Sequence, residues 1–420
     1  MSRSGSASTS LFSRCVAVCA VILLGIPSLS LSQGLTAIQP PVEEMTTGGT
    51  MMVNVAPELL NALESDAGFG LSEQASKSRT FRVYMVAGTG ELGSIGDGGL
   101  ATRARLWFAA GVAVDAVGNI VIADSFNNRV RRVDAASGKI ETVAGTGQQG
   151  FSGDGDLATE AQLNSPSGVA IDDKGNIIIA DSFNNRIRIV DPRTGIISTL
   201  AGTGEQGFSG DEGLAVRAQL SGPTGLAMGT DGTLFIADSG NHRIRKLDRA
   251  QQIIVTVAGS GIAGEAGDGG PGVQAELNGP SGLAVDGNGH LLIADTMNNR
   301  VRRVDAVSGI MSTVAGTGEE GFDGDGASAT LARLMQPSGI AVDAEGAVYL
   351  SDTFNNRIRR IDGESGIITT VAGTDLRGHS INGMVAETAP LNNPMGLTRD
   401  PSGNLLVADS GNHCVLRIMP

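Results

Sequence analysis

Short apolar runs separated by polar turns recur along the chain from residue 81 onward. Between Pro166 and Gly204 this pattern predicts four strands: Gly168 to Ile171, Ile177 to Ala180, Arg186 to Val190 and Ile196 to Ala201. The second strand is four consecutive apolar residues, so we expect neighbouring elements to cover both of its faces. The segments between the strands are rich in Asp, Asn and Gly, which favour tight turns. The pattern therefore predicts a four-stranded antiparallel unit.

This unit recurs with a constant spacing of 57 residues and without insertion or deletion. One marker is the aspartate that follows the second strand, which appears six times: Asp124, Asp181, Asp238, Asp295, Asp352 and Asp409. A second marker is the Val-Ala-Gly at the end of the fourth strand, which also occurs six times: Gly88, Gly145, Gly202, Gly259, Gly316 and Gly373. A single meander with two apolar faces cannot bury itself, so the copies must stack on one another.

The two ends of the repeat region indicate that the stack closes into a ring. The first fourth-strand copy, Phe81 to Gly88, precedes any inner strands, and the last copy stops after its third strand, Val415 to Met419. Pairing these two segments would remove two bare sheet edges. We therefore predict an all-β fold over residues 81–420. It is a six-bladed β-propeller of four-stranded antiparallel blades, in which strand 81–88 completes the last blade by a one-plus-three closure.

The segment before the repeats has the pattern of a targeting signal. Arg3 and Arg14 precede an apolar run that is too short to span a membrane, and small residues follow it, which predicts a signal peptide over residues 1–32. A lipoprotein reading with Cys19 as the acylated residue is disfavoured because Cys19 lies inside the apolar run. Residues 33–80 carry no repeat and are predicted to be a flexible linker. The mature chain is then expected to be exported, periplasmic or extracellular, with no transmembrane segment and with Cys414 as its single cysteine.

Composition and charge agree with a propeller and disfavour one class of partner. Glycine accounts for 61 of 420 residues, as frequent turns require, and aromatic residues make up only 3%. The formal net charge is −14. A surface of this sign repels phosphate backbones, so no nucleic-acid partner is expected.

Two sets of loops are expected to meet on one face of the ring. Strands alternate in direction, so the turn between the second and third strands lies on the same side as the long connection between blades, such as Gly147 to Pro166. We call this side the loop face, and the opposite side the far face. Because loops held by a rigid scaffold commonly carry function, the loop face is the candidate binding surface.

The repeat itself resembles a known family. The phrase P-S-G-V-A-I-D-x-x-G-N-I-I-I-A-D-S-x-N-N-R-I-R, read from Pro166 onward, resembles the NHL repeat. The connection G-F-S-G-D-G-x-x-A-T-x-A-Q-L-N-S-P is similar to that of teneurin-type NHL domains and of bacterial secreted NHL proteins. The resemblance spans residues 81–420 and implies a six-bladed propeller. It implies less about function, since such propellers serve as ligand-binding or protein-binding modules and occasionally as enzymes.

The motif Asp181, Asn184 and Arg186 has a functional and a structural interpretation. A ring of polar ligands around the mouth of the propeller is the functional one. The structural one is favoured: asparagine suits a positive-φ turn position, and the aspartate can bind turn amides or an arginine. Features repeated in every blade are expected to build the blade, and specific chemistry is expected where the copies differ.

The Gly-Asp-Gly loops allow a calcium interpretation and a structural one. Their aspartates recur as Asp97, Asp154, Asp211, Asp268 and Asp325, with Asn382 in the last copy. The loops lack the spacing that lets six or more oxygens converge on calcium, so these aspartates are expected to cap a following helical turn. For zinc, His242 and His413 share a repeat position three blades apart, and no tight histidine cluster exists. No cofactor is predicted, and calcium or zinc stays an open alternative.

Three phenylalanines in the polar connections are candidate contact residues: Phe151, Phe208 and Phe322. They either face a ligand or plug the space between neighbouring loops, in which case their loss would lower stability instead. Departures from the repeat, Trp107, His379, Asn382 and Cys414, fall in the first and last blades, where closure packing is the favoured explanation.

The favoured function is therefore a monomeric scaffold that binds an unidentified protein, peptide or glycan through the loop face. A binding protein is favoured over an enzyme. The alternatives are a metal-dependent lyase or hydrolase at the propeller axis, and a purely structural spacer.

Overall fold

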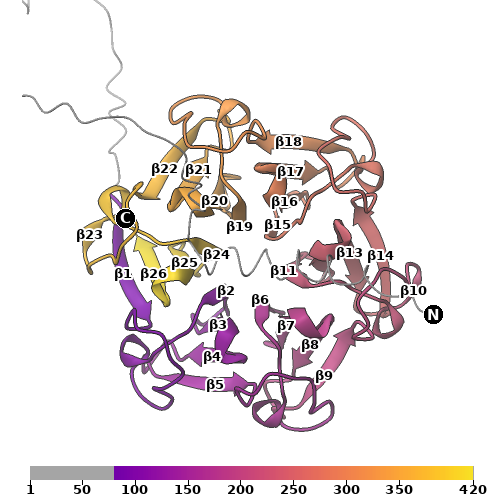
Figure 1. Ribbon diagram of the computed structural model, residues 1–420, viewed down its shortest axis with the longest axis vertical. Coiled ribbons are helices and arrows are strands. Elements are labelled where there is room, and N and C mark those ends of the chain that lie inside the picture. Colours follow the sequence, from indigo (N-terminus) through magenta and orange to yellow (C-terminus); the bar gives the residue numbers. More distant parts are fainter. Residues whose placement is uncertain (1–79, 420) are drawn as a thin grey trace, which may run out of the picture. The chain divides into compact units, whose positions relative to one another are not determined.

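The computed structural model describes residues 80–419, which form six antiparallel blades around a central axis (Figure 1). The prediction of an all-β, six-bladed propeller with four-stranded blades is confirmed. The predicted signal peptide, residues 1–32, and all of the predicted linker except Thr80 lie outside the described residues. Within residues 80–419, no helix is long and apolar enough to cross a membrane.

Each blade contributes one inner strand next to the axis and a second strand beside it. From blade 1 to blade 6 the inner strands are β2 (Ala109–Val114), β6 (Pro166–Ile171), β11 (Pro223–Met228), β15 (Leu283–Val285), β19 (Pro337–Val342) and β24 (Pro394–Arg399). The second strands are β3 (Ile120–Asp124), β7 (Ile177–Asp181), β12 (Leu234–Asp238), β16 (Leu291–Asp295), β20 (Val348–Asp352) and β25 (Leu405–Asp409).

Two further strands complete each blade toward the rim. The third strands are β4 (Arg129–Val133), β8 (Arg186–Val190), β13 (Arg243–Asp248), β17 (Arg300–Val304), β21 (Arg357–Ile361) and β26 (Cys414–Met419). The outer strands are β5 (Ile140–Ala144), β9 (Ile197–Ala201), β14 (Ile253–Ala258), β18 (Met311–Ala315), β22 (Ile368–Gly373) and, for blade 6, β1 (Arg82–Ala87). The two-residue strands β10 (Gly213–Leu214) and β23 (Met384–Val385) lie outside β14 and β1.

Single turns of 3-10 helix are the only helical elements among residues 80–419. One set follows the second strands: η2 (Ser125–Asn127), η4 (Ser182–Asn184), η6 (Ser239–Asn241), η8 (Thr296–Asn298), η10 (Thr353–Asn355) and η12 (Ser410–Asn412). The other set lies in the connections: η1 (Ala101–Arg103), η3 (Ala158–Glu160), η5 (Ala215–Arg217), η7 (Gly272–Gln274), η9 (Ala329–Leu331) and η11 (Ala386–Thr388). The helical turn expected in each connection is thus present, and its first alanine or glycine is buried.

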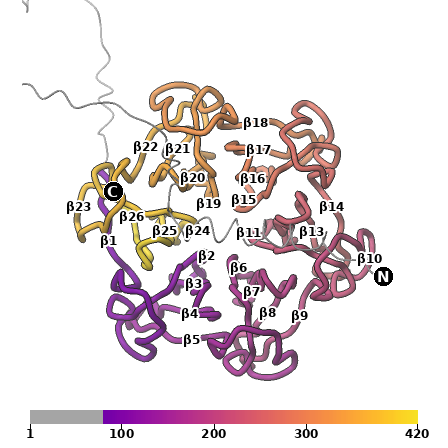
Figure 2. Tube along the Cα trace, viewed as in Figure 1, coloured from indigo at the N-terminus to yellow at the C-terminus, as the bar shows by residue number. Residues whose placement is uncertain are grey.

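The ring closes as predicted. Strand β1 pairs antiparallel with β26, with Val83 opposite Ile418 and Met85 opposite Leu416. In the trace of Figure 2, the indigo start of the repeats lies beside the yellow end of the chain. The closure leaves no bare edge where the two ends of the repeat meet.

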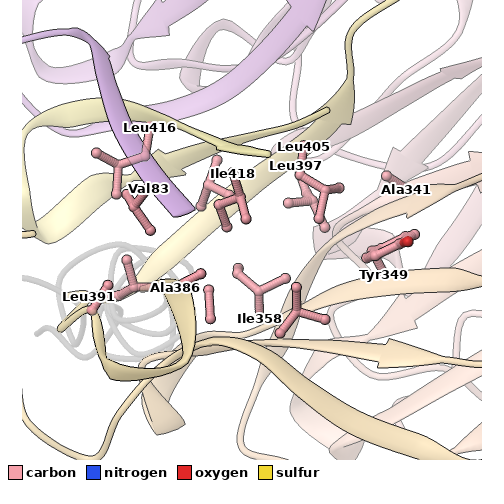
Figure 3. Packing of buried hydrophobic residues seen from close by; sticks show 14 of the residues in the cluster. Val83, Ala341, Tyr349, Ile358, Ala386, Leu391, Leu397, Leu405, Leu416 and Ile418 are labelled. Carbon is pink, nitrogen blue, oxygen red and sulfur yellow. The ribbon is translucent and has the colours of Figure 1, made fainter. Parts of the chain in front are cut away.

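The hydrophobic core is divided into clusters that lie between neighbouring blades. The cluster between blades 5 and 6 joins Tyr349 and Ile358 of one blade to Leu405 and Ile418 of the next, with Val83 from the closing strand (Figure 3). Every residue of β7 is buried, as expected for an apolar run covered on both faces. The apolar surface of each blade is therefore buried by packing against its neighbours and not within the blade itself.

Glycines allow the inner strands to approach one another closely. A Cβ atom on Gly168 of β6 would overlap the carbonyl oxygen of Thr224 in β11. The same overlap with the next blade recurs around the ring, at Gly111, Gly168, Gly225, Gly282, Gly339 and Gly396. Gly168 has no unusual φ, so space rather than backbone conformation requires the glycine.

Candidate functional site

The aspartate at the end of each second strand anchors a buried hydrogen-bond network. In blade 2, Asp181 is fully buried; its Oδ1 accepts from the backbone N–H of Asn164 at 2.7 Å. Its Oδ2 accepts from Asn184 Nδ2 at 2.8 Å and from Arg188 Nη1 at 3.4 Å. Asn184 Nδ2 also donates to the carbonyl oxygen of Gly150, which ties the turn to the long connection. These contacts bring the two loops together on one side of the blade, as the strand directions predicted.

The arginine that pairs with this aspartate was missed in the sequence. It lies two residues after Arg186 and is fully buried in five blades: Arg131, Arg188, Arg245, Arg302 and Arg359. In each of these blades one guanidinium bridges the buried aspartate and the aspartate of the Gly-Asp-Gly loop. The sequence carried a signal for it, because arginine and loop aspartate change together in the last copy, to Leu416 and Asn382.

The expected role of the Gly-Asp-Gly aspartates as helix caps is wrong. No side-chain hydrogen bond caps η3. Asp154 instead accepts from Arg188 Nη2 at 2.8 Å through Oδ1 and from Thr199 Oγ1 at 2.7 Å through Oδ2. The connection therefore packs along the third and outer strands, where Arg188 of β8 offers a charged partner and Thr199 of β9 a hydroxyl donor. The equivalent aspartates Asp97, Asp211, Asp268 and Asp325 bind the corresponding arginines.

Asn184 does not occupy the positive-φ position that we expected for it. The left-handed residue is Asn185, with φ of 50°, and its Oδ1 accepts from the N–H of Gly222 in blade 3. Asn128, Asn299 and Asn356 make the same link to the next blade. Asn184 is needed for its amide, which bridges Asp181 and Gly150.

The two histidines that share a repeat position perform this linking role rather than facing each other. His242 Nδ1 accepts from the N–H of Gly279, and His413 Nδ1 accepts from the N–H of Phe108 across the junction of blades 6 and 1. Burial lowers the pKa of both imidazoles, which favours the neutral form that can accept. Among residues 80–419, no group of three or more His, Cys, Asp or Glu side chains is arranged to hold a metal ion.

The three candidate phenylalanines stack on arginine. The Phe151 ring lies 3.6 Å from the guanidinium carbon of Arg186 and 4.8 Å from that of Arg188. Phe208 and Phe322 stack in the same way on the arginines of blades 3 and 5. Each ring remains 37–40% exposed on the loop face. The rings therefore cover the buried ion pairs, in line with the stabilising role that the sequence left open, and also present an edge to solvent.

Departures from the repeat gather where blade 6 meets blade 1. The Trp107 ring packs edge-on against Phe126, and the Phe108 ring stacks on Phe126 at 4.8 Å. In blade 6, Cys414 replaces the stacking arginine and is buried, and burial followed by the charge of Asp409 raises the pKa of its thiol. Asn382 accepts from the N–H of Met85, so it binds the closing strand.

Burial determines the protonation of the repeated aspartates. It raises the pKa of Asp181 to about 6, against the opposing effects of Asn184, Asn164 and Arg188. In blade 6 Leu416 occupies the repeat position of the arginine, and burial raises the pKa of the equivalent Asp409 to about 7. Among the repeated aspartates, Asp409, which has no arginine partner, thus has the most strongly raised pKa.

We expect Asp409 to give the propeller a specific pH dependence. Its pKa is higher in the folded chain than its ordinary value of 3.8, so it contributes stability that is present at low pH and lost as the pH rises through about 7. Asp409→Asn removes this titration. Urea unfolding at pH 5, 6, 7 and 8 should show the wild-type losing stability relative to the variant by up to about 1.4 kcal/mol per pH unit below pH 7. Parallel pH profiles of the two proteins would contradict the assignment.

Two family profiles match the chain. The profile described as "Teneurin NHL domain" matches residues 144–207 and 317–381, and that described as "NHL repeat" matches residues 220–247, 277–304 and 391–418. Together they cover about half of the sequence and fall on blades 2–6.

Similar proteins share the repeat but are longer or more distant. The chain is 31% identical to NHL repeat-containing protein 2 of Bos taurus over 340 residues, which is 73% of this chain and 46% of that protein. It is 33% identical to teneurin-4 of Mus musculus over 284 residues, which is 58% of this chain and 10% of that protein. The chain thus spans less than half the length of these relatives. A structural genomics protein of unknown function from Bacteroides thetaiotaomicron superposes with a TM-score of 0.60 at 18% identity, covering 80% of this chain and 75% of that one, which shows a shared fold.

Proposed function

Since this chain belongs to the NHL-repeat family of β-propellers, we propose that it is an exported scaffold that binds a protein, peptide or glycan through its loop face. Export is proposed from the signal pattern of residues 1–32, and the monomeric state from a ring that completes its own sheet edges.

The observation that carries the proposal is the contrast between a constant interior and a varied loop face. The buried aspartate is the same in all six blades, whereas the turn residue two positions later is Phe in three blades, Gly in two and Met in one: Phe126, Phe183, Phe354, Gly240, Gly411 and Met297. Phe183 and Met297 are each 40% exposed. Variation at exposed apolar positions over an invariant framework is typical of a recognition surface.

Charge also supports a protein or peptide over nucleic acid. The chain carries 44 acidic and 30 basic residues, and ten of the arginines are the two per blade in blades 1–5 that pack in the repeated network or against its connections. Few of these guanidinium groups are available to a phosphate backbone, so the net negative charge dominates the exposed surface.

Matched substitutions on the two faces test this proposal. Phe183→Lys with Met297→Lys places two charges on the loop face, and Val117→Lys with Val307→Lys places two on the far face, where these valines are 75% and 95% exposed. Affinity capture with the full chain, from the cells and medium that produce it, should recover its partner at least tenfold less with the loop-face pair. The far-face pair should behave as the wild-type, and both variants should melt at wild-type temperatures. Equal recovery with both variants would reject the loop face as the binding surface.

A further inference from the structure

Blade 4, like blade 1, lacks the aromatic ring that covers the arginines in blades 2, 3 and 5. The repeat position of Phe151, Phe208 and Phe322 is occupied by Ser94 in blade 1 and by Glu265 in blade 4. Arg300, the equivalent of Arg186, forms an ion pair with Glu265 in place of a ring stack. The Glu265 side chain is 65% exposed, so it does not fill the space that a ring occupies over the arginine in blades 2, 3 and 5.

A shallow hollow, largely open to solvent, lies at this position. It is lined by Glu265, Asp268, Arg300, Thr313, Thr317 and Thr330. These residues come from the connection before blade 4, strands β17 and β18, and the connection to blade 5. The hollow therefore lies on the outer part of the loop face, beside the strand end that carries the stacking arginine.

The guanidinium in the hollow keeps one of the two contacts that hold it in the stacked blades. In those blades Nη1 donates to a turn carbonyl, as Arg186 Nη1 does to Asn184, whereas Arg300 Nη1 donates to Glu265. Arg300 Nη2 donates to the carbonyl oxygen of Thr317 at 2.8 Å, and Arg186 Nη2 donates to the equivalent oxygen of Thr203 at 2.6 Å. The repeat thus supplies one shared backbone anchor for this guanidinium, whether or not the blade supplies the ring.

The charges around the hollow are balanced. Glu265 pairs with Arg300, and Asp268 pairs with the buried Arg302. Burial opposes ionisation of Asp268, but the hydrogen bond from Thr313 and the charge of Arg302 hold its pKa below the usual value. Because both carboxylates of the hollow are already paired with arginine, the hollow favours an uncharged ligand group over a free cation or anion.

We propose that this hollow binds an aromatic side chain of a peptide ligand, tyrosine or phenylalanine, which stacks on Arg300 as Phe151 stacks on Arg186. The assignment deepens the proposed function and rests on it, because it names the chemistry of one contact on the loop face. Glu265 is the exposed partner of the Glu265–Arg300 pair, and ion pairs with an exposed partner are weak, so a ring can displace the carboxylate. An aromatic ring stacks favourably on a guanidinium, and the threonine hydroxyls can hydrogen-bond a phenol.

Two substitutions that the chain itself suggests test the proposal. Glu265→Phe gives blade 4 the residue of blades 2, 3 and 5 and closes the hollow, and Phe208→Glu opens an equivalent hollow in blade 3. The probes are the peptides Ac-Gly-Tyr-Gly-NH2 and Ac-Gly-Leu-Gly-NH2, titrated into the full chain and followed by ligand-observed NMR. We expect the tyrosine peptide to bind at least fivefold more tightly than the leucine peptide, to lose this preference with Glu265→Phe, and to gain a second site with Phe208→Glu.

Other outcomes overturn the proposal. Equal affinity for the two peptides, or a tyrosine preference that survives Glu265→Phe, removes the aromatic site. Binding of maltotriose in place of the tyrosine peptide, blocked by Glu265→Phe, makes the hollow a saccharide site instead. Melting temperature controls for folding, because Glu265→Phe restores a stack already present in three blades and should melt at or above the wild-type temperature. Partner capture separates the two proposals. If capture is lost with the loop-face lysine pair but kept with Glu265→Phe, the loop face binds the partner and the hollow is not an aromatic site.

Discussion

Gly168→Ala is expected to destabilise the propeller by about 3 kcal/mol, at the upper end of the usual cost of overpacking. The new methyl group would overlap the carbonyl oxygen of Thr224, and that oxygen belongs to the backbone of a neighbouring inner strand. A side chain could rotate away, but a backbone carbonyl can move only if blades 2 and 3 separate. Urea unfolding followed by tryptophan fluorescence and circular dichroism measures the loss.

Gly287→Ala is the matched control. A Cβ atom on Gly287 meets no atom within 4 Å, and this glycine has no unusual φ. Its replacement should change the free energy of unfolding little, or raise it slightly by restricting the unfolded chain. If Gly168→Ala and Gly287→Ala unfold at the same urea concentration, close approach of the inner strands is not what requires glycine.

Arg188→Leu should cost about 3–5 kcal/mol at pH 7, because it leaves a buried carboxylate without its counter-ion. Arg188 is fully buried and joins Asp181 of the second strand to Asp154 of the connection. Removing it breaks both contacts and uncovers one face of the Phe151 ring. The loss should be smaller at pH 5 than at pH 7, since Asp181 without the arginine can take up a proton at the lower pH.

Two further variants identify the cause of this loss. Arg193→Leu removes an arginine of the same blade that is 86% exposed and pairs with Asp191, so it should change stability by less than about 1 kcal/mol. Arg188→Leu with Asp154→Asn reproduces the residues of blade 6 and should recover part of the loss. A single Arg188→Leu variant no less stable than Arg193→Leu would show that the buried pair does not hold the connection.

The fold could be predicted from the sequence because its information is local and periodic. Apolar runs such as Ile177 to Ala180 identify strands, and the constant spacing of Asp181 and its equivalents fixes the blade count. Pairing of Val83 with Ile418 follows from counting unmatched strands. One boundary moved slightly: β6 begins at Pro166 rather than Gly168, because Pro166 still pairs with Asp181 beyond an irregularity in the register.

The network of the candidate site could be predicted only in part, because its contacts join residues far apart in sequence. Asp154 and Arg188 are 34 positions apart, and nothing near Asp154 indicates that the chain turns back to the third and outer strands. The helix-cap prediction failed for this reason. The hollow at Glu265 was also missed, since it arises from the absence of a ring and not from a recognisable motif.

The pairing of β1 with β26 closes the ring, and it also determines the order in which the blades can be completed during synthesis. Strand β1 is made first, but its partner β26 follows roughly 330 residues later, which takes on the order of half a minute at ribosomal rates. Until then β1 carries an unsatisfied row of amide groups, and blade 6 cannot form. The final step must bring the two most distant strands together, and this long-range contact is expected to limit the folding rate.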